Sequence, residues 1–180
     1  WTGAVNGYWS EPGNWIPAGP AGPGDLLQFR RDDDAHRSMT NDIVGLTVAL
    51  QFGLDENDHD YQLDGNAIRL YENHGIEISP DGSSTITINC PLIIFQEDTS
   101  FYLSTYGGFI FDQTTRLYLN GPIIFEGGSL RLTPNSTDSI TGPDGSSHIY
   151  VSGPISGPGT VRTHTRDNST VSFLGSLNNT

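Results

Sequence analysis

The hydrophobic residues of this chain fall in short runs in which apolar and polar positions often alternate. Alternation predicts β-strands with one buried face, because successive side chains of a strand point to opposite sides. The chain has 22 Gly and 11 Pro, which interrupt it every few residues and leave room for single turns of helix at most. We therefore predict an all-β protein. The expected strands are residues 26–29, 46–52, 61–63, 67–71, 75–78, 85–88, 92–95, 101–104, 109–111, 116–119, 122–125, 129–132, 148–151, 159–163 and 170–174.

A short phrase recurs among these runs. Its four copies are LDGNAI (63–68), INCPLI (88–93), LNGPII (119–124) and VSGPIS (151–156). They align on Gly65, Cys90, Gly121 and Gly153, at intervals of 25, 31 and 32 residues. Self-similarity at a period of roughly 20 to 50 residues is typical of solenoids and propellers, and propeller blades run longer than these intervals. A β-solenoid is therefore the expected architecture, with residues 116–132 supplying the three strands of one coil.

We expect the aligned turns to stack at one corner of the solenoid. Gly accepts backbone angles that other residues resist, and the Pro that follows gives up a ladder N–H. Ile88, Leu119 and Val151 would then line one interior column. Cys90, the single cysteine, has no partner for an internal disulfide and no nearby His to activate it, so we interpret it as a small buried residue.

The first residues differ from the rest. WTGAVNGYWSEPGNW contains Trp1, Trp9 and Trp15, all the tryptophans of the chain. One interpretation is a hydrophobic cap at one end of the solenoid, because terminal repeats are atypical. The other is a platform on which the indole faces stack against sugar rings. The predicted organisation is one domain over residues 1–180, with a cap or entry segment at 1–24 followed by irregular coils at 25–180.

The charge excludes some functions and leaves one metal candidate. The chain has 21 acidic and 8 basic residues, all Arg, and a net charge of −13. Such a chain lacks the cationic face that nucleic acid or anionic lipid requires. Asp55, Asp58 and Asp60 in DENDHD form a weak Ca²⁺ candidate, since hard cations take clustered oxygens, but the loop lacks the Gly and Glu of an EF-hand. We expect no other cofactor.

Further motifs bear on localisation and chemistry. Asn135, Asn168 and Asn178 begin sequons in polar segments and are glycosylation candidates. No apolar run approaches the ~18 residues of a membrane-spanning helix. The five His share no metal-ligand spacing, and no phosphate loop or nucleophile elbow occurs. These observations favour a secreted or cell-surface protein without enzymatic activity. The alternative is a glycan-binding or polysaccharide-active β-helix module that uses loop carboxylates.

Several stretches resemble one family. WTGAVNGYWSEPGNW, PGDLLQF, GLTVALQF, YQLDGNAIRL with GIEI, and NSTVSFLGSLNNT are similar to segments of the autotransporter-associated β-strand repeat proteins. The resemblance covers most of residues 1–78 and 116–180. It implies a right-handed parallel β-helix from a large bacterial surface or secreted chain, and it implies no catalytic residues. SGPISGPGTVRTHTRDNSTV departs from the family by lacking the Lys that usually precedes the final strand.

The edges of a solenoid expose unpaired backbone groups that recruit further strands. TVSFLGSLNNT reads as one more apolar strand with no charged or Pro-rich plug after it. We therefore expect self-association end to end, with the chain acting as a filament subunit or as one module of a surface stalk or adhesin.

Overall fold

A computed structural model describes residues 1–29, 36–52, 60–71, 75–78, 83–95, 99–105, 114–136, 146–165 and 168–178. In this part of the chain the structure is all-β, and its single helix is a 3₁₀ turn, η1 (Pro12–Asn14). The strands pair in parallel in both sheets. The prediction of an all-β protein with at most single helical turns is therefore confirmed.

The strands form three parallel faces. Face A is a six-stranded sheet of β2 (Ser38–Asn41), β4 (Tyr61–Gly65), β7 (Ser84–Ile88), β10 (Thr114–Leu119), β13 (Ser146–Val151) and β16 (Thr170–Phe173). Face B contains β1 (Leu26–Phe29), β3 (Thr47–Phe52), β6 (Ile76–Ile78), β9 (Thr99–Thr105), β12 (Ser129–Ser136) and β15 (Thr160–Thr163). Face C contains β5 (Ile68–Leu70), β8 (Leu92–Ile94), β11 (Ile123–Phe125), β14 (Ile155–Ser156) and β17 (Leu177–Asn178).

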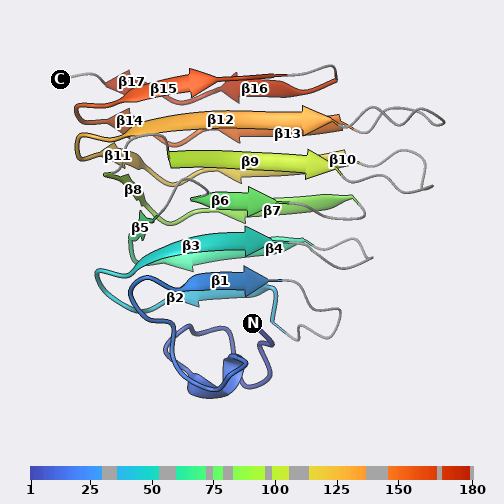
Figure 1. Cartoon of the computed structure of the whole chain (residues 1–180), viewed down its shortest axis with the longest axis vertical. Coiled ribbons are helices and arrows are strands. Elements are labelled where there is room, and N and C mark those ends of the chain that lie inside the picture. The colour runs from blue at the N-terminus through green and yellow to red at the C-terminus, as the bar shows by residue number, and fades with distance from the viewer. Residues whose placement is uncertain are drawn as a thin grey trace.

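Faces B and C belong to one 11-stranded sheet, in which the long strand β3 links the two faces. Thr47 and Val48 pair with β5 of face C, whereas Leu50–Phe52 pair with β6 of face B. After β3, the chain visits faces A, C and B in the same order again and again, and Figure 1 shows the successive units piled from one end of the molecule to the other. Strands β10, β11 and β12 include the three strands predicted within residues 116–132.

The register places equivalent residues in columns across face A. Leu63, Ile88, Leu119 and Val151 are aligned and each is at most 1% exposed. The predicted interior column is thus confirmed, and Leu63 extends it. Each buried Ile, Leu or Val side chain contributes about 1.5–3 kcal/mol in transfer free energy, so these columns stabilise the fold.

The repeated corner is a second column, formed where face A turns into face C. The register extends it beyond the four predicted members to Asn41 at one end and Gly175 at the other. A Cβ at Gly121 would lie 2.1 Å from the carbonyl oxygen of Cys90, and one at Gly153 would lie 2.0 Å from that of Gly121. Gly121 and Gly153 therefore have to be glycine, because the backbone of the preceding unit occupies the space of a side chain, whereas Asn41 and Cys90 show that other members of the column have room for one.

Polar side chains beside this corner form hydrogen bonds to one another along the stack. Asn89 Nδ2 donates to Asp64 Oδ1 at 2.8 Å, and Asn120 Nδ2 donates to Asn89 Oδ1 at 3.0 Å. Ser152 Oγ then donates to Asn120 Oδ1 at 2.6 Å. The residue before each turn is thus fixed by its equivalents in the neighbouring units.

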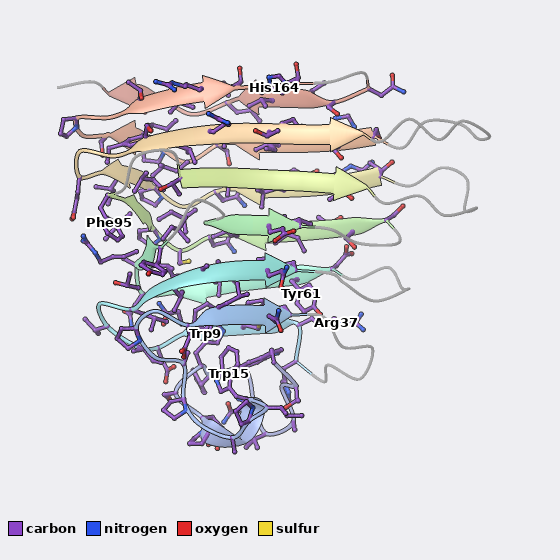
Figure 2. All side chains as sticks on the ribbon, in the orientation of Figure 1. Trp9, Trp15, Arg37, Tyr61, Phe95 and His164 are labelled. Carbon is purple, nitrogen blue, oxygen red and sulfur yellow. The ribbon has the colours of Figure 1, made fainter. Side chains whose placement is uncertain are left out.

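The first fifteen residues cover one end of the core. Trp9 stacks on Phe29 of β1 at 5.8 Å between ring centroids, and Phe29 stacks on Phe52 of β3 at 4.8 Å. Trp1 and Trp15 pack edge to face at 4.8 Å. Figure 2 shows Trp9 and Trp15 gathered beside β1 at the N-terminal end of the stack.

Buried Asn14 holds this segment together. Its Oδ1 accepts from the backbone N–H of Val5 at 2.9 Å and of Asn6 at 3.2 Å. Its Nδ2 donates to Asn6 Oδ1 at 3.0 Å and to the Tyr8 carbonyl at 2.9 Å. Asn14 is fully buried, so all of its side-chain polar atoms are satisfied within the segment.

The sequence pattern missed three short strands. Strand β2, with the sequence SMTN, carries a single large apolar residue, Met39, and β14 and β17 have two residues each. Pairing with neighbouring strands, not local hydrophobicity, makes these segments extended. The expected strand at 109–111 lies outside the described residues.

Substitution of Gly153 by Ala tests the corner column. The new methyl group would collide with the Gly121 carbonyl, which is backbone and has little freedom to move. We expect Gly153→Ala to lower the free energy of unfolding in urea by about 1–3 kcal/mol or more, as overpacking does. Gly19→Ala is the matched control, because nothing lies within 4 Å of its new Cβ, and it should change stability by less than ~0.5 kcal/mol. Equal stability of the two variants would contradict the close approach.

Candidate functional site

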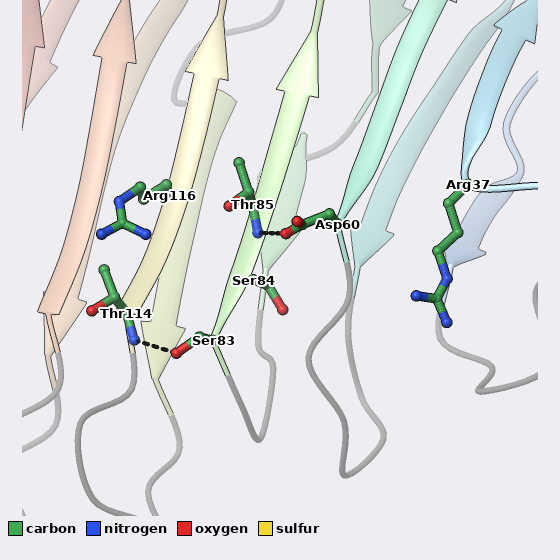
Figure 3. A pocket seen from close by; sticks show the side chains of 7 residues that line it. All are labelled: Arg37, Asp60, Ser83, Ser84, Thr85, Thr114 and Arg116. Carbon is green, nitrogen blue, oxygen red and sulfur yellow. Dashed lines mark hydrogen bonds between the residues drawn. The ribbon is translucent and has the colours of Figure 1, made fainter.

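A polar cleft of about 320 Å³ opens where several face A strands begin. Its lining comes from four neighbouring strands or the residues just before them, as Figure 3 shows. Arg37 precedes β2, Asp60 precedes β4, and the other lining residues, from β7 and β10 or just before them, are Ser83, Ser84, Thr85, Thr114 and Arg116.

The floor of the cleft is held by hydrogen bonds between neighbouring units. Asp60 Oδ1 accepts from the backbone N–H of Thr85 at 2.7 Å, and Ser83 Oγ accepts from the backbone N–H of Thr114 at 3.0 Å. The in-register pairing sets Asp60, Thr85 and Arg116 in one outward row, because Tyr61 pairs with Ile86 and Thr85 pairs with Arg116. These side chains are therefore fixed by the stack beneath them.

The two arginines stand at opposite sides of this floor. Both are half-buried, and Arg37 Nε is a buried nitrogen that has no hydrogen-bond partner. Strands of a sheet lie ~4.8 Å apart, so the three steps from β2 to β10 separate the two backbones by roughly 14 Å. Asp60 is the one carboxylate in the described lining. Glycoside hydrolysis normally uses a pair of carboxylates, and the described lining supplies one.

The same face continues beyond the cleft with aromatic residues. Tyr118 of β10 stacks on Tyr150 of β13, with ring centroids 4.8 Å apart and an angle of 11° between the planes. His148 lies in the outward row of Arg116, and its Nδ1 is 2.8 Å from Thr170 Oγ1. Burial, and then the charge of Arg116, lower the pKa of His148 below its ordinary value, so the imidazole is neutral at pH 7.

Apart from Asp60, which belongs to the Ca²⁺ candidate, sequence reasoning missed the residues of this cleft. Arg37 ends the charged stretch RRDDDAHR (30–37), whose composition is typical of a solvated loop, and Arg116 is an ordinary polar position of a predicted strand. The repeat itself held one signal, because Thr85, Arg116 and His148 each lie five residues before the aligned residue of a copy. The repeat did not show that Arg37 joins them, since no copy of the phrase follows Arg37 at that distance.

The structure places the predicted sugar-stacking tryptophans inside the molecule. Trp1, Trp9 and Trp15 are 5%, 0% and 9% exposed, and their rings contact one another and Phe29. The indole of Trp15 donates to the Trp9 carbonyl at 2.9 Å. No open indole face is left for a sugar ring in this arrangement, which favours the cap interpretation.

The predicted Ca²⁺ ligands are only partly visible. Asp60 belongs to the polar cleft, whereas Asp55 and Asp58 lie outside the described residues. Among the residues that the structure describes, no group of three or more His, Cys, Asp or Glu side chains could hold a metal ion. The Ca²⁺ candidate therefore stays a prediction.

The glycosylation candidates lie near strand ends. Asn168 is exposed in the turn before β16. Asn135 lies in β12 and Asn178 in β17, and their side chains are outside the described set. Exposure of Asn168 is compatible with a glycan, and modification itself stays a prediction.

Comparison with known proteins finds no matching family model, curated protein or solved structure. The resemblance to the autotransporter-associated β-strand repeat proteins therefore stays a prediction as well. In the described ranges, no helix has the length and apolar character needed to cross a membrane.

Tryptophan fluorescence tests the location of the indoles. Because all three rings are buried, we expect native emission at the blue end of the tryptophan range and weak quenching by acrylamide. Addition of neutral oligosaccharides should leave the spectrum unchanged, and urea should shift it to the red. Quenching by a sugar in the folded protein would instead support the stacking platform.

Cys90 offers a second test. It is 2% exposed, and burial raises the pKa of its thiol to about 12. Since only the thiolate is nucleophilic, a disulfide reagent at pH 8 should not label the native chain, whereas it should label one thiol per chain in urea. Labelling at equal rates with and without urea would show that the corner is open.

Proposed function

We propose that this chain is a non-catalytic β-solenoid protein of the cell surface or the extracellular space, with the structural role of a stalk or adhesin module. Its residues 1–24 close one end, and its C-terminal end joins the same end of a second copy. The repeated order of faces A, C and B and the parallel columns support the solenoid. The acidic, Lys-free composition and the resemblance to surface-protein repeats support the location.

The observation that carries the assembly is the exposure of the last member of an interior column. Val151 is 1% exposed, whereas Phe173, its register partner in the next unit, is 42% exposed. Val161 and Val171, at the same end, are only partly buried. Beyond β15, β16 and β17 no described strand occupies the outer edge. Apolar interior residues and open strand edges at one end favour addition of further strands.

The opposite end is already occupied. Tyr8 forms a parallel bridge with Thr40 of β2, the Thr40 N–H donates to the Gly7 carbonyl at 2.8 Å, and Trp9 covers Phe29. A head-to-tail filament would have to displace this segment. Contact between two C-terminal edges leaves the described N-terminal segment in place, and it is isologous, so it closes as a pair.

Sedimentation velocity of the purified 180-residue chain over a wide concentration range tests this proposal. We expect a reversible monomer–dimer equilibrium. Phe173→Asp should weaken it at least tenfold, because an unpaired carboxylate would be buried between the ends, at a cost of more than about 1.4 kcal/mol. The matched control is Leu174→Asp, on the adjacent residue. Leu174 follows the last residue of β16, and its side chain is 72% exposed.

The outcomes separate clearly. Loss of dimers in Phe173→Asp with retention in Leu174→Asp would support pairing through the interior column. A wild-type chain that stays monomeric at all concentrations would refute pairing by a second copy. Polymers that grow with concentration would refute the closed pair in favour of a filament.

A further inference from the structure

The polar cleft on face A has features that a purely structural role leaves unexplained. A chain of net charge −13 places two of its eight arginines at one opening. Asp60, the carboxylate between them, accepts a hydrogen bond from the backbone N–H of Thr85. Arg37 Nε is buried without a hydrogen-bond partner, and a buried donor left unsatisfied is unfavourable. A ligand with acceptor oxygens would satisfy it.

We propose that this cleft binds an acidic saccharide, an oligosaccharide that carries carboxylates on its sugar rings. Arg37 and Arg116 would pair with carboxylates, since the planar guanidinium matches a carboxylate in two parallel hydrogen bonds. Asp60 and the hydroxyl groups of Thr85 and Thr114 would bond to sugar hydroxyls. The separation of the arginines by roughly three strand spacings suits an extended ligand better than a single small anion.

The arrangement of the lining supports a saccharide over a free ion. A small anion would sit at one guanidinium, whereas the cleft of about 320 Å³ extends across β4, β7 and β10 and is floored by serine and threonine. That volume is at the lower end of ordinary ligand pockets, which run from ~300 to 1,000 Å³. Beyond Arg116 the face continues with the half-exposed Tyr118–Tyr150 stack, which offers apolar ring surface to a longer chain.

Isothermal titration of the full chain with tetragalacturonate tests the proposal. Maltotetraose serves as the neutral tetrasaccharide, and inorganic sulfate as the free anion. We expect binding of tetragalacturonate that weakens with added salt, because the cleft is open to solvent and its charges are screened. Binding of maltotetraose and of sulfate should be at least tenfold weaker.

Two variants locate the site. Arg116→Gln and Arg37→Gln each replace the charged guanidinium with a neutral amide, and each should weaken binding of tetragalacturonate about tenfold or more, as loss of a charged hydrogen bond does. The control is Arg131→Gln, which removes the same charge from an exposed position of β12 on face B. Thermal melting of each variant should match the wild type, so that a loss of binding is not a loss of folding.

Several results would overturn the proposal: no binding of tetragalacturonate, equal binding of maltotetraose, equal binding of sulfate, or an equal effect of Arg131→Gln. Equal binding of sulfate would reduce the cleft to a small-anion site. None of these results bears on association through Phe173, which lies in the last strand of face A, away from the cleft.

Discussion

In-register parallel stacking is the constraint on which the rest of this structure depends. Each residue lies beside its equivalent in the next unit, ~4.8 Å away, and its side chain has to fit between the two neighbours. At the corner the available space is smaller than a methyl group, because the carbonyl of the preceding unit lies within 2.1 Å of where a Cβ would be at Gly121 and Gly153. In the interior the same constraint selects apolar residues of similar size.

Stacking also decides which polar residues are tolerated. Like charges directly opposite each other repel, whereas amides both donate and accept along a stack. The ladder Asp64, Asn89, Asn120 follows this logic, with one carboxylate as an acceptor at its end. On face B, Gln28 donates to Gln51 at 2.7 Å and Gln51 donates to Glu77 at 3.1 Å, again with the carboxylate last. A chain of net charge −13 can therefore form close ladders by keeping its acids at their ends.

The same rule accounts for the two places where function is proposed. The last described member of an interior column, Phe173, has a described neighbour on one side only, and it is 42% exposed. Outward rows are fixed by the columns beneath them, so the pairing of the strands holds Asp60, Thr85 and Arg116 in one preorganised polar row. Proposed assembly and proposed ligand binding thus use different parts of one periodic arrangement, its end and its side.

The sequence by itself determined the strand class, the corner and the interior column, because these depend on local properties: alternation, glycine at a fixed place, and a repeated interval. Ile88, Leu119 and Val151 align through the repeated phrase alone. Only the tertiary structure decided that SMTN is a strand, that Asn41 takes a glycine position at the corner, and that the tryptophans point inward. It alone brought Arg37 beside the row of Arg116. Such neighbours are set by the register between units. Because the segments that connect face B to face A differ in length, the local sequence pattern does not reveal that register.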